Sequence, residues 1–315
     1  MGSVSLIALT SLAGLFSVVT GINDGGALLA TGLKIPSIRP MIGLAALMTA
    51  VALVPLVTHQ VAATFTTRLT NMDVPGGRIV MAVAVLSALT VVTFLSNRGR
   101  PTSLTLAIVG ALTGAGLGWG LPVSGRAVLF VLAVGVAAPF VGGLLAILIS
   151  RMLMLLARGR RLRQWHRAGF ALQCLAYAAN DGQKMLAIFM IALGFEGAPL
   201  PICLVVAGLF GVGALYGLPR AGRALSREII ASRPLHGVTA ELSSGTAVIG
   251  CAAIGAPVSM TQTIAGALIG AGVAESTGKV RWHAATKIVL AWTLTLPVSG
   301  LLAAAAALIV RGVIA

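Results

Sequence analysis

The sequence predicts an all-α integral membrane protein with about ten transmembrane segments, arranged as two inverted repeats of five segments with broken helices at two Asn-Asp-Gly sites. Three observations predict this fold: a hydrophobic fraction of 58% with only 9% charged residues, long runs without any charge, and motifs that occur twice. A soluble domain carries about 25% charged residues. The composition therefore excludes a soluble enzyme, and the net charge of +15 is read as a membrane-topology signal instead of a nucleic-acid signal.

The predicted segments follow from the apolar runs, because about 20 apolar residues are needed to cross a bilayer. The first and the sixth are interrupted near the middle by Asn-Asp-Gly, so we expect a broken helix in each. The ten segments are 5–33, 39–58, 78–96, 101–120, 127–150, 168–194, 199–219, 234–255, 257–275 and 285–310.

Basic residues predict the orientation, because Lys and Arg collect on the side that is not translocated. The densest group lies in a predicted cytoplasmic loop, 158–167, and consists of Arg158, Arg160, Arg161, Arg163 and Arg167. With ten crossings, 17 of the 22 Lys and Arg residues fall on the cytoplasmic side and four fall outside. We therefore expect a multi-pass protein of the cytoplasmic membrane with both termini outside.

Two pairs of motifs indicate an internal duplication. Residues 101–116 and 257–272 share ten identities in sixteen positions at an offset of 156, and the Asn-Asp-Gly sites lie 157 apart. Five segments per half is an odd number, so the second half enters the membrane from the opposite side, as in many secondary transporters. We expect a first membrane repeat at 1–157, the basic loop at 158–167 and an inverted second repeat at 168–315.

The acidic residues of the two Asn-Asp-Gly sites are candidate cation ligands. A carboxylate within a membrane span is costly unless it faces a cavity or a partner, and amide and carboxylate oxygens suit a small cation such as Na⁺. The alternative is a helix cap in a short loop, and the second copy favours the cation site. The predicted cation ligands are Asn23, Asp24, Asn180 and Asp181.

The Pro-x-Ser-x-Thr segments are candidate anion sites, because Pro favours a helix start and the free N–H groups and hydroxyls of a first turn bind oxyanions. The alternative is that these hydroxyls only cap or pack helices. The segments supply Pro101, Ser103 and Thr105, and Pro257, Ser259 and Thr261.

Two further charged residues lie within predicted spans. Lys184 follows Asp181 by three residues, where the first repeat has Ala27. On a continuous helix it can pair with Asp181, which we favour, or it can neutralise a bound anion. Glu241 is either a proton or cation ligand or an acceptor for the hydroxyls of Ser243, Ser244 or Thr246.

Three motifs together resemble the signatures of the inorganic phosphate transporter (PiT) family. They are Gly21-Ile22-Asn23-Asp24, Ala179-Asn180-Asp181-Gly182-Gln183-Lys184 and Pro257-Val258-Ser259-Met260-Thr261-Gln262, with 281–297 as a further similar stretch. The resemblance covers nearly the whole chain and implies a homodimeric carrier that moves phosphate with a cation. It implies cation coordination at the Asn-Asp pairs and phosphate binding at Ser103, Thr105, Ser259, Thr261 and Gln262. The His that ends the usual Pro-Val-Ser-Thr-Thr-His signature is absent from both copies.

We therefore expect a compact, prokaryotic-type phosphate importer driven by H⁺ or Na⁺, with no other cofactor. We add Gln183 and Lys184 to the phosphate set and Glu241 to the cation set. The expected partners are phosphate, the coupling cation, membrane lipids and a second copy of the chain. The alternatives are a permease for sulfate or another tetrahedral oxyanion, a membrane enzyme that uses Asp24 and Asp181 as acid and base, and an anion channel.

Overall fold

The computed structural model describes residues 3–32, 35–97, 102–156, 160–228 and 233–314, and these ranges are helical almost throughout. Each predicted segment overlaps a helix, and α7, α8, α10 and α13 extend beyond the predicted bounds. The elements are α1 (Ser3–Thr20), η1 (Gly21–Gly25), α2 (Gly26–Gly32), α3 (Pro40–Val57), α4 (Gln60–Ala63), η2 (Thr64–Arg68), α5 (Gly77–Asn97), α6 (Leu104–Trp119), α7 (Gly125–Leu156), α8 (Arg160–Tyr177), η3 (Ala178–Gly182), α9 (Gln183–Leu193), α10 (Leu200–Glu228), α11 (Pro234–Ala253), α12 (Met260–Glu275), η4 (Thr277–Lys279) and α13 (Trp282–Ile314).

Within these ranges, six helices are long and apolar enough to cross a membrane, and α6 is a shorter apolar helix. The six are Leu6–Leu29, Pro40–Val57, Gly77–Ser96, Gly125–Leu156, Leu200–Leu218 and Trp282–Ile314. On the outer surfaces of these helices, large apolar side chains such as Leu155 and Val313 are more than four-fifths exposed. Such broad apolar exposure is what a lipid-facing surface requires.

The basic loop predicted at 158–167 is largely helical, because α8 begins at Arg160. Arginine is a good helix former, and the exposed arginines let the helix continue beyond its apolar part. The described arginines of this group are all exposed, at Arg160, Arg161, Arg163 and Arg167. Lys34, Arg98, Arg100, Pro101 and Arg158 lie outside the described residues.

The same order of elements occurs twice along the chain. The continuous helix α1–η1–α2 has its counterpart in α8–η3–α9, and α3 corresponds to α10. The helix pair α5–α6, which we call hairpin 1, corresponds to α11–α12, hairpin 2. The long helices α7 and α13 have 32 and 33 residues, and each contains one proline, Pro139 and Pro297.

Each hairpin packs against the long helix of the other half through glycines. A Cβ atom on Gly114 of α6 would lie 1.9 Å from the backbone oxygen of Gly300 in α13, and one on Gly270 of α12 would lie 2.1 Å from that of Gly143 in α7. Small residues let membrane helices approach this closely. The glycines that meet a backbone in this way are Gly110, Gly114, Gly118, Gly266 and Gly270.

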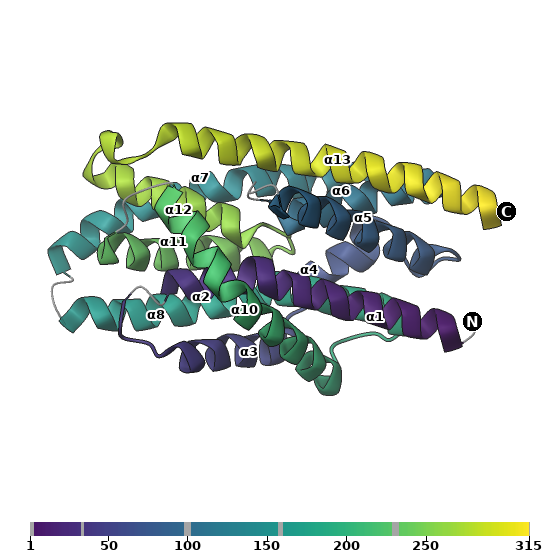
Figure 1. Ribbon diagram of the computed structural model, residues 1–315, viewed down its shortest axis with the longest axis horizontal. Helices are drawn as coiled ribbons and strands as arrows, with labels where there is room; N and C mark the ends of the chain where they lie inside the picture. The colour runs from purple at the N-terminus through teal and green to yellow at the C-terminus, as the bar shows by residue number, and fades with distance from the viewer. Residues whose placement is uncertain (1–2, 33–34, 98–101, 157–159, 229–232, 315) are drawn as a thin grey trace.

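The two hairpins occupy opposite ends of the molecule and meet in its interior. Hairpin 1 lies toward the end that holds both termini, and hairpin 2 lies toward the other end (Figure 1). Where they meet, the Thr105 hydroxyl at the start of α6 donates to the carbonyl oxygen of Val258, just before α12, at 3.2 Å. By contrast, α7 and α13 extend along nearly the whole length of the molecule (Figure 1).

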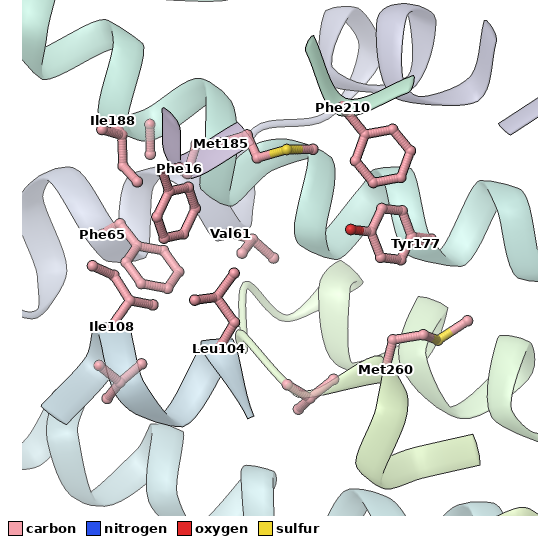
Figure 2. Close-up of a cluster of buried hydrophobic side chains, with 14 of the residues drawn as sticks. Phe16, Val61, Phe65, Leu104, Ile108, Tyr177, Met185, Ile188, Phe210 and Met260 are labelled. Atoms are coloured by element: carbon pink, nitrogen blue, oxygen red, sulfur yellow. The ribbon is translucent and has the colours of Figure 1, made fainter. Parts of the chain in front are cut away.

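Large side chains fill the space around this meeting point. Phe16 of α1, Phe65 of η2, Leu104 of α6, Tyr177 of α8 and Met185 of α9 are at most 3% exposed. They come from both halves of the chain and surround one region (Figure 2). The interior between the hairpin tips is therefore a packed apolar cluster into which a few polar groups project.

Candidate functional site

The two Asn-Asp-Gly sites form single π-helical turns inside otherwise continuous helices. The turns are Gly21–Gly25 and Ala178–Gly182, and the flanking residues keep right-handed helical angles. The expected broken helix is therefore a widened turn rather than a gap. A π turn changes the i→i−4 hydrogen-bond pattern and frequently marks a functional site. In the first turn, Gly21 also permits close packing, since a Cβ on Gly21 would lie 2.1 Å from the backbone oxygen of Phe210.

Lys184 joins the second π turn to both hairpin tips. Its Nζ lies 2.8 Å from Asp181 Oδ1, so the ion pair that the spacing favours is present. The same ammonium donates to Thr105 Oγ1 at 2.7 Å and to the carbonyl oxygen of Val258 at 2.6 Å. Asp181 and Lys184 are each 3% exposed. A buried charge pair with these further hydrogen bonds has the compensation that desolvation demands.

The two asparagines of the paired motifs have different partners. Asn180 Nδ2 donates to the carbonyl oxygen of Ala256 at 3.1 Å, and Asn180 Oδ1 accepts from the Val258 N–H at 3.2 Å. Asn180 therefore holds the tip of hairpin 2. Asn23 Nδ2 instead donates to the neighbouring Asp24 Oδ1 at 3.1 Å.

The serines of the Pro-x-Ser-x-Thr segments cap helices. Ser103 Oγ accepts from the Leu106 N–H at 3.2 Å, and Ser259 Oγ accepts from the Gln262 N–H at 3.4 Å. Both are N-caps, as the capping alternative describes. The Thr261 hydroxyl lies 2.9 Å from Ser259 Oγ. Ser103, Thr105, Ser259, Thr261 and Gln262 are all buried around the hairpin tips.

Gln183 has a structural partner instead of a place among these hydroxyls. Its Oε1 accepts from the backbone N–H groups of Val61 at 2.8 Å and Ala62 at 3.1 Å, at the start of α4. These N–H groups have no partner within the helix, so the Gln183 amide oxygen satisfies them. This contact gives Gln183 a structural role at α4 and does not involve the helix starts where phosphate binding is expected.

Glu241 lies away from the π turns. Its Oε1 is 3.2 Å from His166 Nε2, and both side chains are almost fully buried. His166 precedes Asp181 by fifteen residues on one continuous helix, which is about 22 Å at 1.5 Å per residue. The other face of His166 is hydrogen-bonded through Nδ1 to Ser37. Glu241 thus joins α11 to α8 and does not reach the central carboxylates.

Glu241 also does not accept hydrogen bonds from the nearby hydroxyls, which is the alternative role. The three hydroxyls near it in sequence donate to backbone carbonyls of their own helix instead. Serine and threonine commonly make such i−4 bonds within helices. These hydroxyls belong to Ser243, Ser244 and Thr246.

Two groups near the site were not expected from the sequence. The backbone oxygen of Val258 is a direct partner of the ammonium, and backbone groups carry no sequence signal. Tyr177 precedes Asp181 by one helical turn, so spacing alone could have placed both on one face. Its hydroxyl points into the apolar cluster (Figure 2) and has no hydrogen-bond partner among the described residues.

Chemically, the site is rich in oxygen ligands and poor in other metal ligands. The Asp24 carboxylate lies within electrostatic range of both Asp181 and Lys184. Within the described ranges, no three His, Cys, Asp or Glu side chains cluster to hold a transition metal. Carboxylate, amide, hydroxyl and carbonyl oxygens suit a hard cation, and helix-start hydroxyls and N–H groups suit an oxyanion.

Comparison with known proteins agrees with this architecture. Residues 161–303 match the model of the phosphate transporter family. Over 95% of its length, the chain is 28% identical to a probable low-affinity inorganic phosphate transporter of Rhizobium meliloti (strain 1021), and the match covers 94% of that protein. A protein of the same description from Bacillus subtilis (strain 168) is 26% identical over 96% of the chain and 95% of its own length.

A solved structure has the same fold. It is described as the sodium-dependent phosphate transporter, and it superposes with a TM-score of 0.83 at 18% identity, over 98% of this chain and 100% of that one. The fold match extends beyond the second half, to which the family model is confined, and the apolar helices make this a multi-pass membrane protein. The second half of the chain thus matches the phosphate transporter family, and nearly the whole chain is similar to proteins described as inorganic phosphate transporters.

Proposed function

We propose that the chain is a secondary active transporter that imports inorganic phosphate across the cytoplasmic membrane together with H⁺ or Na⁺, by alternating access. The relatives matched over nearly their whole length are described as phosphate transporters, and this similarity argues against the membrane-enzyme alternative. The observation that carries the mechanism is the Lys184 ammonium, which joins a π turn to the tips of both hairpins. We propose no cofactor other than the coupling ion.

The topology that we propose has two inverted repeats, 1–157 and 168–315. Because the hairpin tips meet in the interior, each hairpin enters and leaves on its own side, and each half crosses the membrane three times instead of five. Three is still odd, so the second repeat remains inverted and both termini remain outside. The assigned sides of the described basic residues do not change, and Arg98 and Arg100 lie outside the described residues.

The roles that we propose for the site residues follow their positions. Cation coordination falls to the oxygens of Asn23, Asp24, Asn180 and Asp181, and Na⁺ is one candidate. Phosphate contacts the helix starts of α6 and α12, where hydroxyls and N–H groups gather. We propose structural roles for Gln183 at α4 and for Glu241 at His166. The phosphate set is Ser103, Thr105, Ser259, Thr261 and Gln262, with Lys184 close by.

Coupling to a cation follows from the energetics of moving an anion. Against an inside-negative potential, each negative charge that enters costs about 2.3 kcal/mol per 100 mV. A co-transported cation cancels this cost. Separation of the hairpin tips from one another would open the site to one side at a time, and homodimers in the membrane lipid would carry one such site per protomer.

Uptake of radiolabelled phosphate into proteoliposomes tests the proposal. We expect accumulation against a phosphate gradient when an inward Na⁺ or proton gradient is imposed, and collapse of uptake when that gradient is dissipated. Accumulation against a gradient excludes a channel. No uptake with either cation gradient would overturn the proposal, provided that the protein is monodisperse before reconstitution.

A sulfate or other oxyanion permease is the second candidate, because hydroxyl and N–H donors bind any tetrahedral oxyanion. Competition distinguishes the two: excess sulfate should leave labelled phosphate uptake nearly unchanged if phosphate is the substrate. Inhibition by sulfate at concentrations equal to phosphate would favour the permease.

A further inference from the structure

The two π turns differ in the residue that stands three positions after the aspartate. Lys184 follows Asp181, whereas Ala27 follows Asp24. All four side chains are buried. The chain therefore contains the same turn twice, once with a covalently attached positive charge and once without it.

The Lys184 ammonium has three oxygen partners of the kind that bind a monovalent cation. They are a carboxylate oxygen of Asp181 at 2.8 Å, the hydroxyl of Thr105 at 2.7 Å and the carbonyl oxygen of Val258 at 2.6 Å. An ammonium has three donors and no acceptor, so each donor has one oxygen. Hard cations prefer the same oxygen ligands. The ammonium thus occupies a place with the chemistry of a cation site.

The repeat predicts a corresponding place in the other half, with the same ligand types and with alanine instead of lysine. By the repeat offset, Asp181 corresponds to Asp24, Thr105 to Thr261, and the Val258 carbonyl to that of Thr102. Thr261 there turns its hydroxyl to a neighbouring serine, and Asp24 accepts from the adjacent asparagine amide. These groups are held by local partners that a cation can replace.

When both aspartates are ionised, the charges at the centre do not balance without an added cation. Two carboxylates and one ammonium leave one negative charge in a buried region, where uncompensated charge is costly. Asp181 Oδ2 is buried and has no hydrogen-bond partner among the described residues, so this oxygen remains available as a cation ligand. One mobile monovalent cation restores neutrality.

We propose that Lys184 is a tethered substitute for one coupling cation, so that the exchangeable monovalent-cation site is the one beside Asp24. An otherwise identical chain with alanine at both positions would need two mobile cations for the same neutrality. Lys184 therefore lowers by one the number of cations that move with each anion. That the replaced cation is a coupling cation rests on the proposed function. That the ammonium occupies a cation site does not.

Equilibrium binding of ²²Na⁺ to purified protein without phosphate tests the substitution directly. Lys184→Ala recreates the alanine of the first repeat and leaves room for an ion, so we expect one more bound Na⁺ per protomer than in the wild type. Lys184→Met also removes the charge but fills the space, and we expect no such gain. An unchanged stoichiometry in monodisperse Lys184→Ala protein, or an equal gain in both variants, would overturn the proposal.

A structure of the wild-type protein with inorganic phosphate bound gives a second test that does not depend on the variants. We expect the ammonium to remain on Asp181, Thr105 and Val258, as a fixed cation would. Movement of Nζ from these oxygens onto the phosphate would make Lys184 an anion ligand and overturn the proposal. A gain of Na⁺ in Lys184→Ala with no phosphate uptake by the wild type would instead reject the proposed function and leave this inference standing.

Discussion

Asn180 Oδ1 accepts a hydrogen bond from the backbone N–H of Val258 at 3.2 Å. With the bond from Asn180 Nδ2 to Ala256, this contact fixes the tip of hairpin 2 to the second π turn. The same loop supplies the carbonyl that receives the Lys184 ammonium. The geometry of the charged centre therefore depends on this single amide.

Asn180→Ala should destabilise the protein much more than Asn23→Ala. The first change leaves a buried N–H and a buried carbonyl without partners, each of which costs about 1–3 kcal/mol. Asn23 bonds to its neighbour Asp24 and is only half-buried, so its loss should cost less than about 1 kcal/mol. Thermal unfolding in detergent measures both, and equal shifts would contradict the clamp.

Both Asp24→Asn and Asp181→Asn should abolish coupled phosphate uptake, because each removes a proposed cation ligand. Their effects on stability should differ. Asp181→Asn leaves the Lys184 ammonium buried without its counter-charge, which costs about 3–5 kcal/mol in comparable buried pairs.

A double variant, Asp181→Asn with Lys184→Met, provides the control, since it removes both charges of the pair. We expect it to recover part of the lost stability without recovering uptake. Normal coupled uptake in both single variants would refute the cation site.

Gln183→Ala should lower the free energy of unfolding by about 1–2 kcal/mol, the usual cost of a lost helix cap. Its KM for phosphate should change less than that of Thr105→Val, which removes a hydroxyl between Lys184 and Val258. Transport kinetics on matched amounts of folded protein measure this. A larger KM effect from Gln183→Ala would restore Gln183 to the phosphate site.

His166 and Glu241 should show strong coupling in a double-mutant cycle of stability. They face each other at 3.2 Å in a buried interface between α8 and α11. Removal of either one should be destabilising, and the double His166→Ala, Glu241→Ala variant should cost less than the sum by roughly 0.5–3 kcal/mol. Additive effects in chemical unfolding would show that the pair contributes no interaction.

The glycine contacts give a prediction with internal controls. Gly114→Ala and Gly270→Ala place a methyl group about 2 Å from a backbone oxygen of α13 or α7, and such overpacking typically costs about 1–3 kcal/mol. Gly135→Ala and Gly208→Ala face open space and should be tolerated. Melting temperatures of the four variants decide whether close helix approach stabilises the fold.

Local patterns predicted the helices and the Lys184–Asp181 pair. Hydropathy finds apolar helices wherever they lie, and a spacing of three residues determines an intrahelical contact. Hydropathy could not show that α5, α6, α11 and α12 form hairpins whose tips meet inside, since an apolar helix of about 20 residues has the same composition whether or not it crosses.

Long-range contacts explain the remaining differences at the site. Gln183 reaches α4 across 122 residues of chain, and Lys184 reaches Thr105 across 79. Nothing local in the sequence specifies either contact. Asn23 and Asn180 stand in the same motif, and only their tertiary surroundings make one of them a clamp.

Because each hairpin packs against the long helix of the other half, the order in which the helices are synthesised affects when each hairpin can pack. Hairpin 2 follows α7 in the chain, so its glycine face meets an existing partner as soon as it is made. Hairpin 1 precedes α13 by most of the second half, and its glycine face stays without that partner until α13 emerges from the ribosome. The first half of this protein therefore cannot complete its own packing, and its maturation waits for α13.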